Sequence, residues 1–199
     1  MDKTKVVIFD FVHTLYTNVV YESWFNYCKQ ALIELIKDIP EDVLELLDNH
    51  GNIGDVKMIE TLSKAGLCAK DWIDYRRNHL RTFDITNAKS VDKQVLNKFA
   101  SKYSLYIVTH NQRFDVERVA KAIGIDLNLF KDILTNTFED GLFSKKYMYN
   151  KIIEKENVKP EQVFVIGDDY EHDIEPALEI GARAKQVLDC NFKLEDFDL

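Results

Sequence analysis

The sequence has few cysteines and no long apolar run, and so lacks features that are typical of secreted and membrane-spanning proteins. Its 199 residues include only three cysteines, Cys28, Cys68 and Cys190, which lie far apart. An odd number of widely spaced cysteines predicts neither a disulfide framework nor a metal-binding motif. No run approaches the roughly 18 apolar residues of a membrane-spanning helix, and no charged-then-apolar leader is visible. We therefore expect a cytoplasmic protein with reduced cysteines.

Positive charge is also in short supply. The chain carries 26 lysines and arginines against 34 aspartates and glutamates, which gives a net charge of −8. Nucleic-acid-binding surfaces need a dense basic face, and an anionic membrane attracts basic proteins. We therefore expect neither partner. A small-molecule substrate, bound by a monomer or a homodimer, fits this composition. The substrate can be anionic if a metal ion and a few lysines supply local positive charge.

Short apolar runs recur along the chain and predict buried strands. The clearest are residues 5–9, 105–108 and 163–166, which have the length and composition of strands buried on both faces. Residues 132–134 and 184–188 are weaker candidates. Amphipathic helical patterns separate these runs. Strands that alternate with helices pair in parallel, so a layered α/β domain is expected.

Residues 16–86 interrupt this alternation, because they contain no convincing strand. Apolar side chains at helical spacing over residues 21–39 predict a long helix that Pro40 ends. A shorter stripe over residues 56–65 predicts another helix, ended by Gly66. Several amphipathic helices within one insertion predict a small helical bundle.

Acidic residues cluster directly after two of the expected strands. Asp10 follows the first, and Gly-Asp-Asp-Tyr-Glu-His-Asp, residues 167–173, follows the run at 163–166. Active sites of α/β sheets gather at the carboxyl ends of the strands. A carboxylate there is costly unless it is paired or bound to a metal, and clustered oxygen ligands suit Mg²⁺. We therefore expect a magnesium site that includes Asp10 and Asp168.

Four segments, in order, resemble the motifs of the haloacid dehalogenase-like hydrolase superfamily. Residues 10–14 resemble the first motif, a strand followed by Asp-x-Asp-x-Thr. Residues 107–109 resemble the second, a strand that ends in threonine or serine. Residues 144–146, Ser-Lys-Lys, stand where the third motif places a lysine ahead of a helix. Residues 167–173 resemble the fourth, Gly-Asp-x-x-x-x-Asp.

The resemblance covers nearly the whole chain and implies its organisation. We expect a Rossmann-like α/β core with a doubly wound, mainly parallel sheet, made of residues 1–15 and 87–199. We expect residues 16–86 to form an α-helical cap inserted after the first motif. Closure of such a cap excludes water from the active site and supplies contacts to the substrate.

The resemblance also implies roles for individual residues. Asp10 is expected to attack phosphorus and form an aspartyl-phosphate, with Thr109 holding a phosphoryl oxygen and Lys145 neutralising charge. Lys145 is favoured over Lys146 by its spacing to Tyr149. The expected metal ligands are Asp10, the Val12 carbonyl, Asp168 and Asp173, with the role of Asp169 left open. The expected substrate-binding residues are His13, Thr109, His110, Asn111 and Lys145.

One position departs from the family pattern. Phosphatases of this family carry a second aspartate two residues after the nucleophile, which protonates the leaving group and then activates water. Here that position is Val12. General acid–base catalysis contributes about 10² to 10⁴ in rate, so we expect a slow phosphatase. His13, where the family usually has glycine, is a candidate substitute because histidine exchanges protons near neutral pH. Alternatively, His13 only packs against the cap or faces solvent.

Three classes of function fit these residues. The first is a Mg²⁺-dependent phosphatase of a small phosphorylated metabolite. The second is a dehalogenase or a phosphonatase-type hydrolase, since family members of both kinds lack the second aspartate. The third is a catalytically weakened protein that binds a phosphorylated ligand. Dehalogenases of this family need no metal and have few acidic residues in the fourth motif. The retained Asp168, Asp169 and Asp173 therefore favour a phosphorus substrate.

Overall fold

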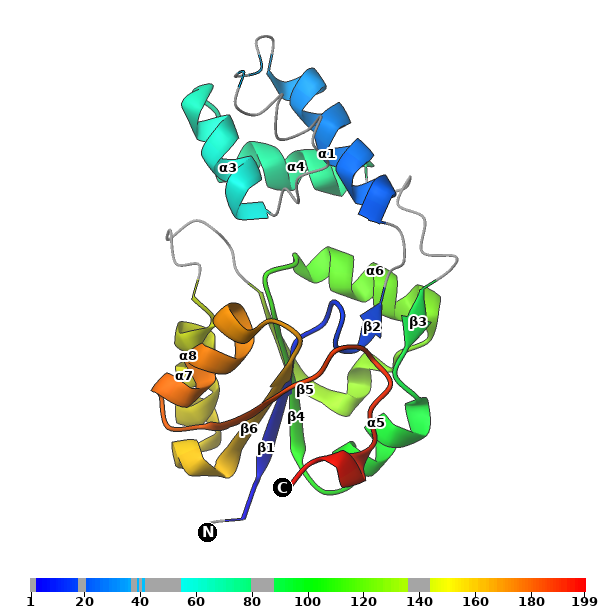
Figure 1. Ribbon diagram of the computed structural model, residues 1–199, viewed down its shortest axis with the longest axis vertical. Helices are drawn as coiled ribbons and strands as arrows, with labels where there is room; N and C mark the ends of the chain where they lie inside the picture. Colours follow the sequence, from blue (N-terminus) through cyan, green and yellow to red (C-terminus); the bar gives the residue numbers. More distant parts are fainter. Residues whose placement is uncertain are drawn as a thin grey trace. The chain divides into compact units, whose positions relative to one another are not determined.

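Two compact units make up the chain (Figure 1). The sheet unit consists of Met1–Asn18, Ala88–Thr137 and Leu142–Leu199, and the helical unit consists of Val19–Asn87 and Phe138–Gly141. Within the described ranges, no helix has the length and apolarity to cross a membrane. The computed structural model describes residues 3–17, 21–36, 39, 41, 55–79, 88–135 and 144–199.

Parallel strands form the centre of the sheet unit, in the order β5-β4-β1-β6-β7. Val7 of β1 lies beside Leu105 of β4 and Phe164 of β6. The side chains of β1 are completely buried, as expected for a central strand covered on both faces. The five strands are β1 (Val6–Phe9), β4 (Ser104–Thr109), β5 (Phe130–Thr135), β6 (Val163–Gly167) and β7 (Arg183–Gln186).

Helices cover both faces of this sheet, with α7 and α8 on one face and α5 and α6 on the other (Figure 1). On the α7 face, Met148 and Tyr149 pack with Ile8 of β1. On the opposite face, the Phe9 ring packs edge-on against Phe99 of α5. The prediction of a doubly wound, mainly parallel sheet is therefore confirmed. The helices and turns are α5 (Lys93–Ala100), α6 (Arg113–Ile123), η2 (Leu127–Leu129), α7 (Lys145–Glu156), η3 (Pro160–Gln162), η4 (Tyr170–Ile174), α8 (Glu175–Glu179) and η5 (Leu194–Asp196).

Local sequence signals set the ends of the helices beside the carboxyl edge of the sheet. The Ser144 hydroxyl caps α7 by accepting a hydrogen bond from the backbone N–H of Lys146. Lys145 is therefore the first residue of α7 and projects from the end of the helix nearest that edge. α6 ends at Gly124, whose φ of 75° is a left-handed conformation that glycine adopts without strain.

A short antiparallel ribbon lies outside the main sheet. Its strands are β2 (Tyr16–Thr17) and β3 (Lys89–Ser90), with Thr17 opposite Lys89. The expectation that residues 16–86 contain no strand is therefore wrong at its first two positions. A strand of two residues is too short to show the alternation of apolar and polar side chains by which a strand is recognised.

The described part of the helical unit contains α1 (Tyr21–Leu35), α3 (Asp55–Lys64) and α4 (Ala69–His79). α1 ends four residues before the predicted end at Ile39, and Pro40 lies outside the described residues. The three helices share an apolar interior, as their stripes predict. Its fully buried side chains include Cys28, Ala31, Leu32, Met58, Leu62 and Trp72.

Candidate active site

The carboxyl ends of β1, β4 and β6 bring together residues that are distant in the sequence. Asp10 follows β1, and its backbone N–H continues the sheet by donating to the carbonyl of Ile166 at 2.9 Å. Thr109 is the last residue of β4, and Asp168 follows β6 directly. Parallel pairing in register places the ends of these strands at one edge.

Three carboxylates converge at this edge. Side-chain oxygens of Asp10, Asp168 and Asp173 lie within 4.8 Å of one another. Among the residues that the structure describes, no other such group of three His, Cys, Asp or Glu ligands occurs. Asp10 and Asp173 are buried, whereas Asp168 is half-buried. Asp169 is not a member of this group, and its carboxylate instead pairs with the His172 ring, with 3.1 Å between Oδ2 and Nδ1.

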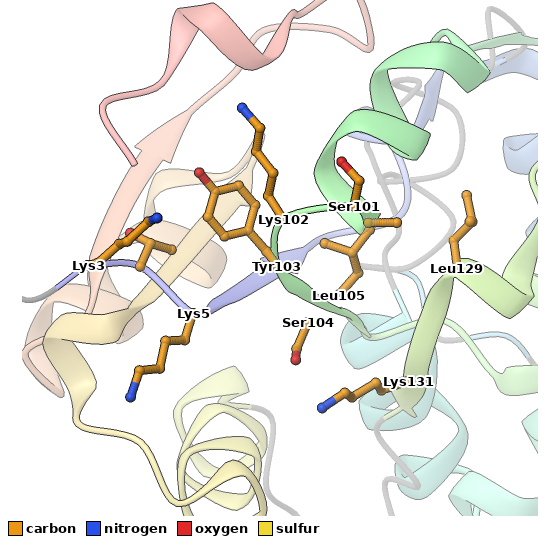
Figure 2. Close-up of a pocket in the computed structure, with 11 residues that line it drawn as sticks. Lys3, Lys5, Ser101, Lys102, Tyr103, Ser104, Leu105, Leu129 and Lys131 are labelled. Atoms are coloured by element: carbon orange, nitrogen blue, oxygen red, sulfur yellow. The ribbon is translucent and has the colours of Figure 1, made fainter.

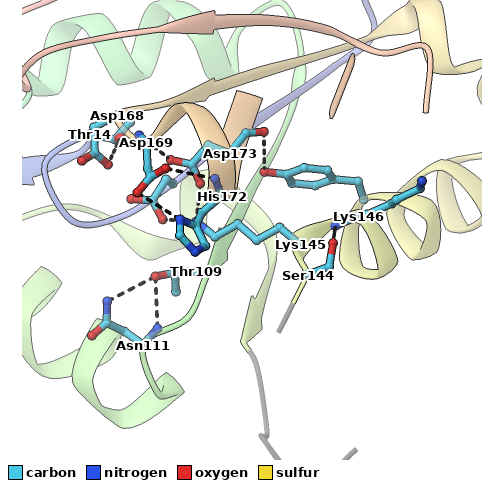
Figure 3. Close-up of polar contacts among 12 residues, drawn as sticks. Thr14, Thr109, Asn111, Ser144, Lys145, Lys146, Asp168, Asp169, His172 and Asp173 are labelled. Carbon is cyan, nitrogen blue, oxygen red and sulfur yellow. Dashed lines mark hydrogen bonds and ion pairs between the residues drawn. The ribbon is translucent and has the colours of Figure 1, made fainter. Parts of the chain in front are cut away.

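Lys145 extends from the start of α7 into the carboxylate cluster (Figure 3). Its Nζ lies 2.5 Å from Oδ1 of Asp10 and 2.5 Å from Oδ1 of Asp173. The Lys145 side chain is only 4% exposed. Lys146 lies on the surface instead, where its Nζ is 3.0 Å from Glu179. The structure therefore brings Lys145, and not Lys146, to the predicted nucleophile.

One lysine does not balance three clustered carboxylates. Burial raises the pKa of Asp10 to about 7; Lys145 opposes this shift, and the negative charge of Asp173 adds to it. Burial, followed by the charge of Asp173, also raises the pKa of Asp168. Burial disfavours the charge of Lys145, but Asp10 and Asp173 outweigh it and raise the pKa of this ammonium group. Lys145 is therefore a permanent cation in a site that retains excess negative charge.

The turn after β6 is shaped around Asp173. Its Oδ2 accepts a hydrogen bond from the backbone N–H of Asp169 at 3.1 Å. The hydroxyl of Tyr149 donates to the Asp173 carbonyl at 3.3 Å. A Cβ atom on Gly167 would overlap the Asp173 carboxyl group, so only glycine leaves room for this carboxylate. Tyr149 was not predicted to be a site residue, because nothing in a linear pattern places it beside Asp173.

The loop after β1 contains a second contact that sequence analysis missed. Thr14 is completely buried, and its hydroxyl donates to Oδ1 of Asp168 at 3.5 Å. The buried hydroxyl thus helps to hold a predicted metal ligand. His13 has a φ of 58°, a left-handed conformation that is uncommon for residues other than glycine. Glycine, which the resemblance implies at this position, adopts such a conformation without strain.

The end of β4 places three of the predicted substrate-binding residues together, Thr109, His110 and Asn111. Thr109 is 1% exposed, and its hydroxyl accepts hydrogen bonds from Asn111. The His110 ring meets the His172 ring edge-on, with 5.8 Å between the centroids. Figure 3 shows His172 between the carboxylates and Thr109 in this view, with Asn111 beyond Thr109. His172 was not predicted, because its contact with His110 joins two separate motifs.

These residues fit a divalent cation. Carboxylate oxygens are the ligands that Mg²⁺ prefers, and the cation takes one or two of them together with waters and phosphate oxygens. The raised pKa values of Asp10 and Asp168 identify excess negative charge that such a cation would neutralise. The candidate ligands in the described chain are Asp10, Asp168 and Asp173.

A pocket of about 610 Å³ opens at the opposite, amino-terminal edge of the sheet (Figure 2). Lys3, Lys5, Lys102 and Lys131 line it, and Lys131 is paired with Glu156 at 2.7 Å. These lysines are exposed, and salt screens exposed charges over about 10 Å. No described carboxylate lines this pocket, in contrast to the carboxyl edge with its three aspartates.

The Rossmann-like sheet thus has a lysine and clustered aspartates at its carboxyl edge, which is where active sites of α/β sheets gather. The family model of haloacid dehalogenase-like hydrolases matches residues 4–181, and the chain belongs to this family. The resemblance of the four motifs is thus confirmed at the level of the family. No curated protein matches the chain at a significant level.

Solved structures share the fold at low sequence identity. One, described as a predicted phosphoglycolate phosphatase from Haemophilus somnus, has a TM-score of 0.63 and 18% identity over 98% of this chain and 92% of its own. A haloacid dehalogenase-like hydrolase from Streptococcus pneumoniae has a TM-score of 0.65 and 21% identity over 98% and 90%. A Bacillus subtilis protein described as a HAD-hydrolase bound to magnesium has a TM-score of 0.57 and 17% identity over 94% and 89%.

Proposed function

We propose that this chain is a Mg²⁺-dependent phosphatase of a small phosphorylated metabolite, with Asp10 as the nucleophile. The observation that carries the proposal is the contact of Lys145 with Asp10 inside a buried cluster of three carboxylates. This contact fixes the orientation of Asp10 and offsets its charge before substrate binds. The protein from Haemophilus somnus that is described as a predicted phosphatase and the magnesium-bound protein from Bacillus subtilis have the same fold, which supports the proposal.

The proposed reaction has two steps. A carboxylate oxygen of Asp10 bonds to phosphorus while the bond from phosphorus to the leaving oxygen breaks, and the leaving oxygen takes a proton. Water then attacks the aspartyl-phosphate at phosphorus, loses a proton, and restores the Asp10 carboxylate as phosphate leaves. Thr109 donates a hydrogen bond to a phosphoryl oxygen, and Lys145 offsets the charge of Asp10 and the phosphoryl group.

Magnesium would supply charge neutralisation at the phosphoryl oxygens, as Lewis-acid metals do in phosphoryl transfer. Asp10, Asp168 and Asp173 would hold it, together with the Val12 carbonyl. Asp169 and Thr14 would not bind the metal themselves but would support the residues that do. The N–H of Asp169 orients Asp173, and the hydroxyl of Thr14 orients Asp168.

The proposed reaction needs two proton transfers, and the site lacks the usual carboxylate that performs them. Val12 has no proton to give or accept, so efficient transfer requires another group. His13 is the neighbouring candidate. Without proton transfer by His13, the site would bind the phosphorylated ligand but hydrolyse it slowly. Val12 therefore favours a second candidate function, that of a protein that binds a phosphorylated ligand with little turnover.

We further propose that residues 16–86 serve as the cap of the enzyme. The described helices of this segment enclose an apolar core of their own, which includes Leu32, Met58 and Trp72. An insertion with its own core can move as a body, which is what admitting substrate and excluding water require.

Turnover of p-nitrophenyl phosphate, phosphorylated metabolites and haloacids, each with Mg²⁺ and with EDTA, tests the proposal. We expect Mg²⁺-dependent phosphate release that Asp10→Asn abolishes. Lys145→Met should lower turnover by about 10² or more, because a preorganised charge is lost. Lys146→Met is the matched control and should leave turnover near that of the parent, because Lys146 pairs with Glu179 on the surface.

Three outcomes separate the alternatives. Equal phosphate release by the parent and Asp10→Asn would remove Asp10 from the reaction. EDTA-insensitive turnover of a haloacid would identify a dehalogenase instead. Mg²⁺-dependent binding of phosphate without turnover of any ester would favour the second candidate function.

A further inference from the structure

The two lone pairs of the Thr109 hydroxyl are both occupied by one residue. The backbone N–H of Asn111 donates to Thr109 Oγ1 at 3.2 Å, and the side-chain amide of Asn111 donates to the same oxygen at 3.3 Å. A hydroxyl has two acceptor lone pairs and one hydrogen to donate. Asn111 therefore leaves the Thr109 hydroxyl only its donor function.

The hydrogen of this hydroxyl has no acceptor among the described residues, although Thr109 is 1% exposed. A buried donor without a partner is costly, so it indicates the place of a ligand acceptor. Figure 3 shows the two Asn111 contacts and the carboxylate cluster on opposite sides of Thr109 in this view. Because both lone pairs of the oxygen are directed to Asn111, the O–H bond is directed away from this residue.

We infer that Asn111 is a positioning residue that sets the direction of the Thr109 hydroxyl, so that its hydrogen points to a phosphoryl oxygen of the substrate. The inference rests on the proposed phosphatase function. A hydroxyl without such partners rotates among staggered positions, and its reorientation must then accompany the reaction. A donor fixed in advance costs no reorganisation when charge develops on the phosphoryl oxygens.

The side-chain amide of Asn111 has its nitrogen, and not its oxygen, directed to the Thr109 hydroxyl. With its nitrogen toward Thr109, Asn111 forces the hydroxyl to donate to the ligand. If the side chain of residue 111 placed an oxygen there, the Thr109 hydroxyl would donate its hydrogen to that oxygen. The hydrogen could then no longer bind the ligand. Asn111→Asp makes this substitution with almost no change of shape. Asn111→Ala instead removes one of the two contacts and leaves the backbone N–H in place.

A double-mutant cycle with Thr109→Val tests whether Asn111 acts through Thr109. The measurement is kcat and KM for p-nitrophenyl phosphate with saturating Mg²⁺. Thr109→Val should lower kcat by about 10², as loss of a preorganised donor does elsewhere. Asn111→Ala should lower kcat about 5- to 10-fold in the parent, with KM changed less, and less than 2-fold in the Thr109→Val background.

Asn111→Asp distinguishes hydrogen-bond direction from charge. In the parent it should lower kcat more than Asn111→Ala does, because it reverses the hydroxyl and adds a negative charge near the phosphate. In the Thr109→Val background only the effect of the charge remains, so the loss should be clearly smaller. Thr109→Ser keeps a hydroxyl and should preserve the effect of Asn111→Ala.

Additive losses in the two backgrounds would overturn the inference, because a structural defect does not depend on the Thr109 hydroxyl. So would an Asn111→Ala variant with the kcat of the parent. In both cases Asp10-dependent turnover by the parent leaves the proposed function standing. If the parent itself shows no turnover that Asp10→Asn abolishes, the proposed function fails and the inference fails with it.

Discussion

At the scale of single residues, Val12 controls the expected rate of the proposed reaction. Val12→Asp places a carboxylate two residues after the nucleophile, where the family has its acid and base. We expect turnover of p-nitrophenyl phosphate to rise about 10-fold or more, with the full acid–base contribution of about 10² to 10⁴ as the ceiling. An aryl leaving group needs little protonation, so the gain should lie in breakdown of the aspartyl-phosphate.

Two controls accompany this experiment. Val12→Leu changes the volume without adding a carboxylate and should not raise turnover. His13→Ala tests the neighbouring candidate, whose left-handed backbone also places it at a turn that alanine adopts only with strain. A fast parent that His13→Ala cripples would show that a histidine already performs the acid–base role.

Asp10 makes the stability of the metal-free protein depend on pH. Its pKa of about 7 in the folded protein lies above its ordinary value of 3.8. The folded state therefore keeps a proton that the unfolded state releases. The resulting stability is fully present below about pH 4 and is lost as the pH rises through 7. With EDTA present, urea denaturation should show the parent losing more stability between pH 5 and 8 than Asp10→Asn loses. Equal pH dependence in the two proteins would contradict the raised pKa.

The motifs predicted the residues at the centre of the site but not the contacts that support them. Asp10, Lys145 and Asp173 were identified from short patterns and are brought together in the structure. The contact of Thr14 with Asp168 joins residues 154 positions apart, and the contact of Tyr149 with Asp173 spans 24. Such contacts depend on how the elements pack, which no local spacing encodes.

At the scale of elements, the turn after β6 links the shape of the backbone to the proposed metal site. Gly167→Ala would place a Cβ in the space that the Asp173 carboxyl group occupies. We expect the affinity for Mg²⁺, measured by isothermal titration calorimetry, to fall about 10-fold or more, as it does when the groups supporting metal ligands are disturbed elsewhere.

Gly66→Ala is the matched control for this variant. Gly66 has a φ of 81° and nothing within 4 Å of an added Cβ, so alanine there strains the backbone without touching the carboxylates. It should lower stability while leaving the affinity for Mg²⁺ unchanged. Unchanged affinity in Gly167→Ala would show that Asp173 can move aside without cost.

Elements with a strong apolar pattern were predictable, whereas short or marginal ones were not. The run at residues 163–166 corresponds to β6, and even the weak run at 132–134 lies within β5. β2 and β3 escaped prediction because two residues show no period. The predicted helix over residues 21–39 was too long, because apolar spacing continued to Ile39 while the helix ends at Leu35.

At the scale of the whole molecule, the β2–β3 ribbon is the feature with the widest consequence. The chain leaves the sheet unit just after Thr17 and returns just before Lys89, and these two residues face each other in antiparallel pairing. Paired residues of this kind can be joined by a two-residue hairpin turn, for which Asn-Gly is well suited. The segment between Thr17 and Lys89 therefore takes the place that the turn has in an ordinary β-hairpin.

Replacing residues 18–88 by Asn-Gly should accordingly give a shortened protein that still folds. The carboxylate cluster and Lys145 belong to the sheet unit, so Mg²⁺ affinity should stay within a few-fold of that of the full chain. Circular dichroism would measure whether the shortened protein folds, and calorimetry would measure its affinity for Mg²⁺. An unfolded product would show that the sheet unit needs the helical unit in order to fold. A hairpin of this design is an insertion point, because any folded module whose two ends lie close together can be joined there without altering the path of the remaining chain. Under the roles proposed above, the cap that contacts the substrate could then be exchanged while the residues that cleave the phosphate ester are retained.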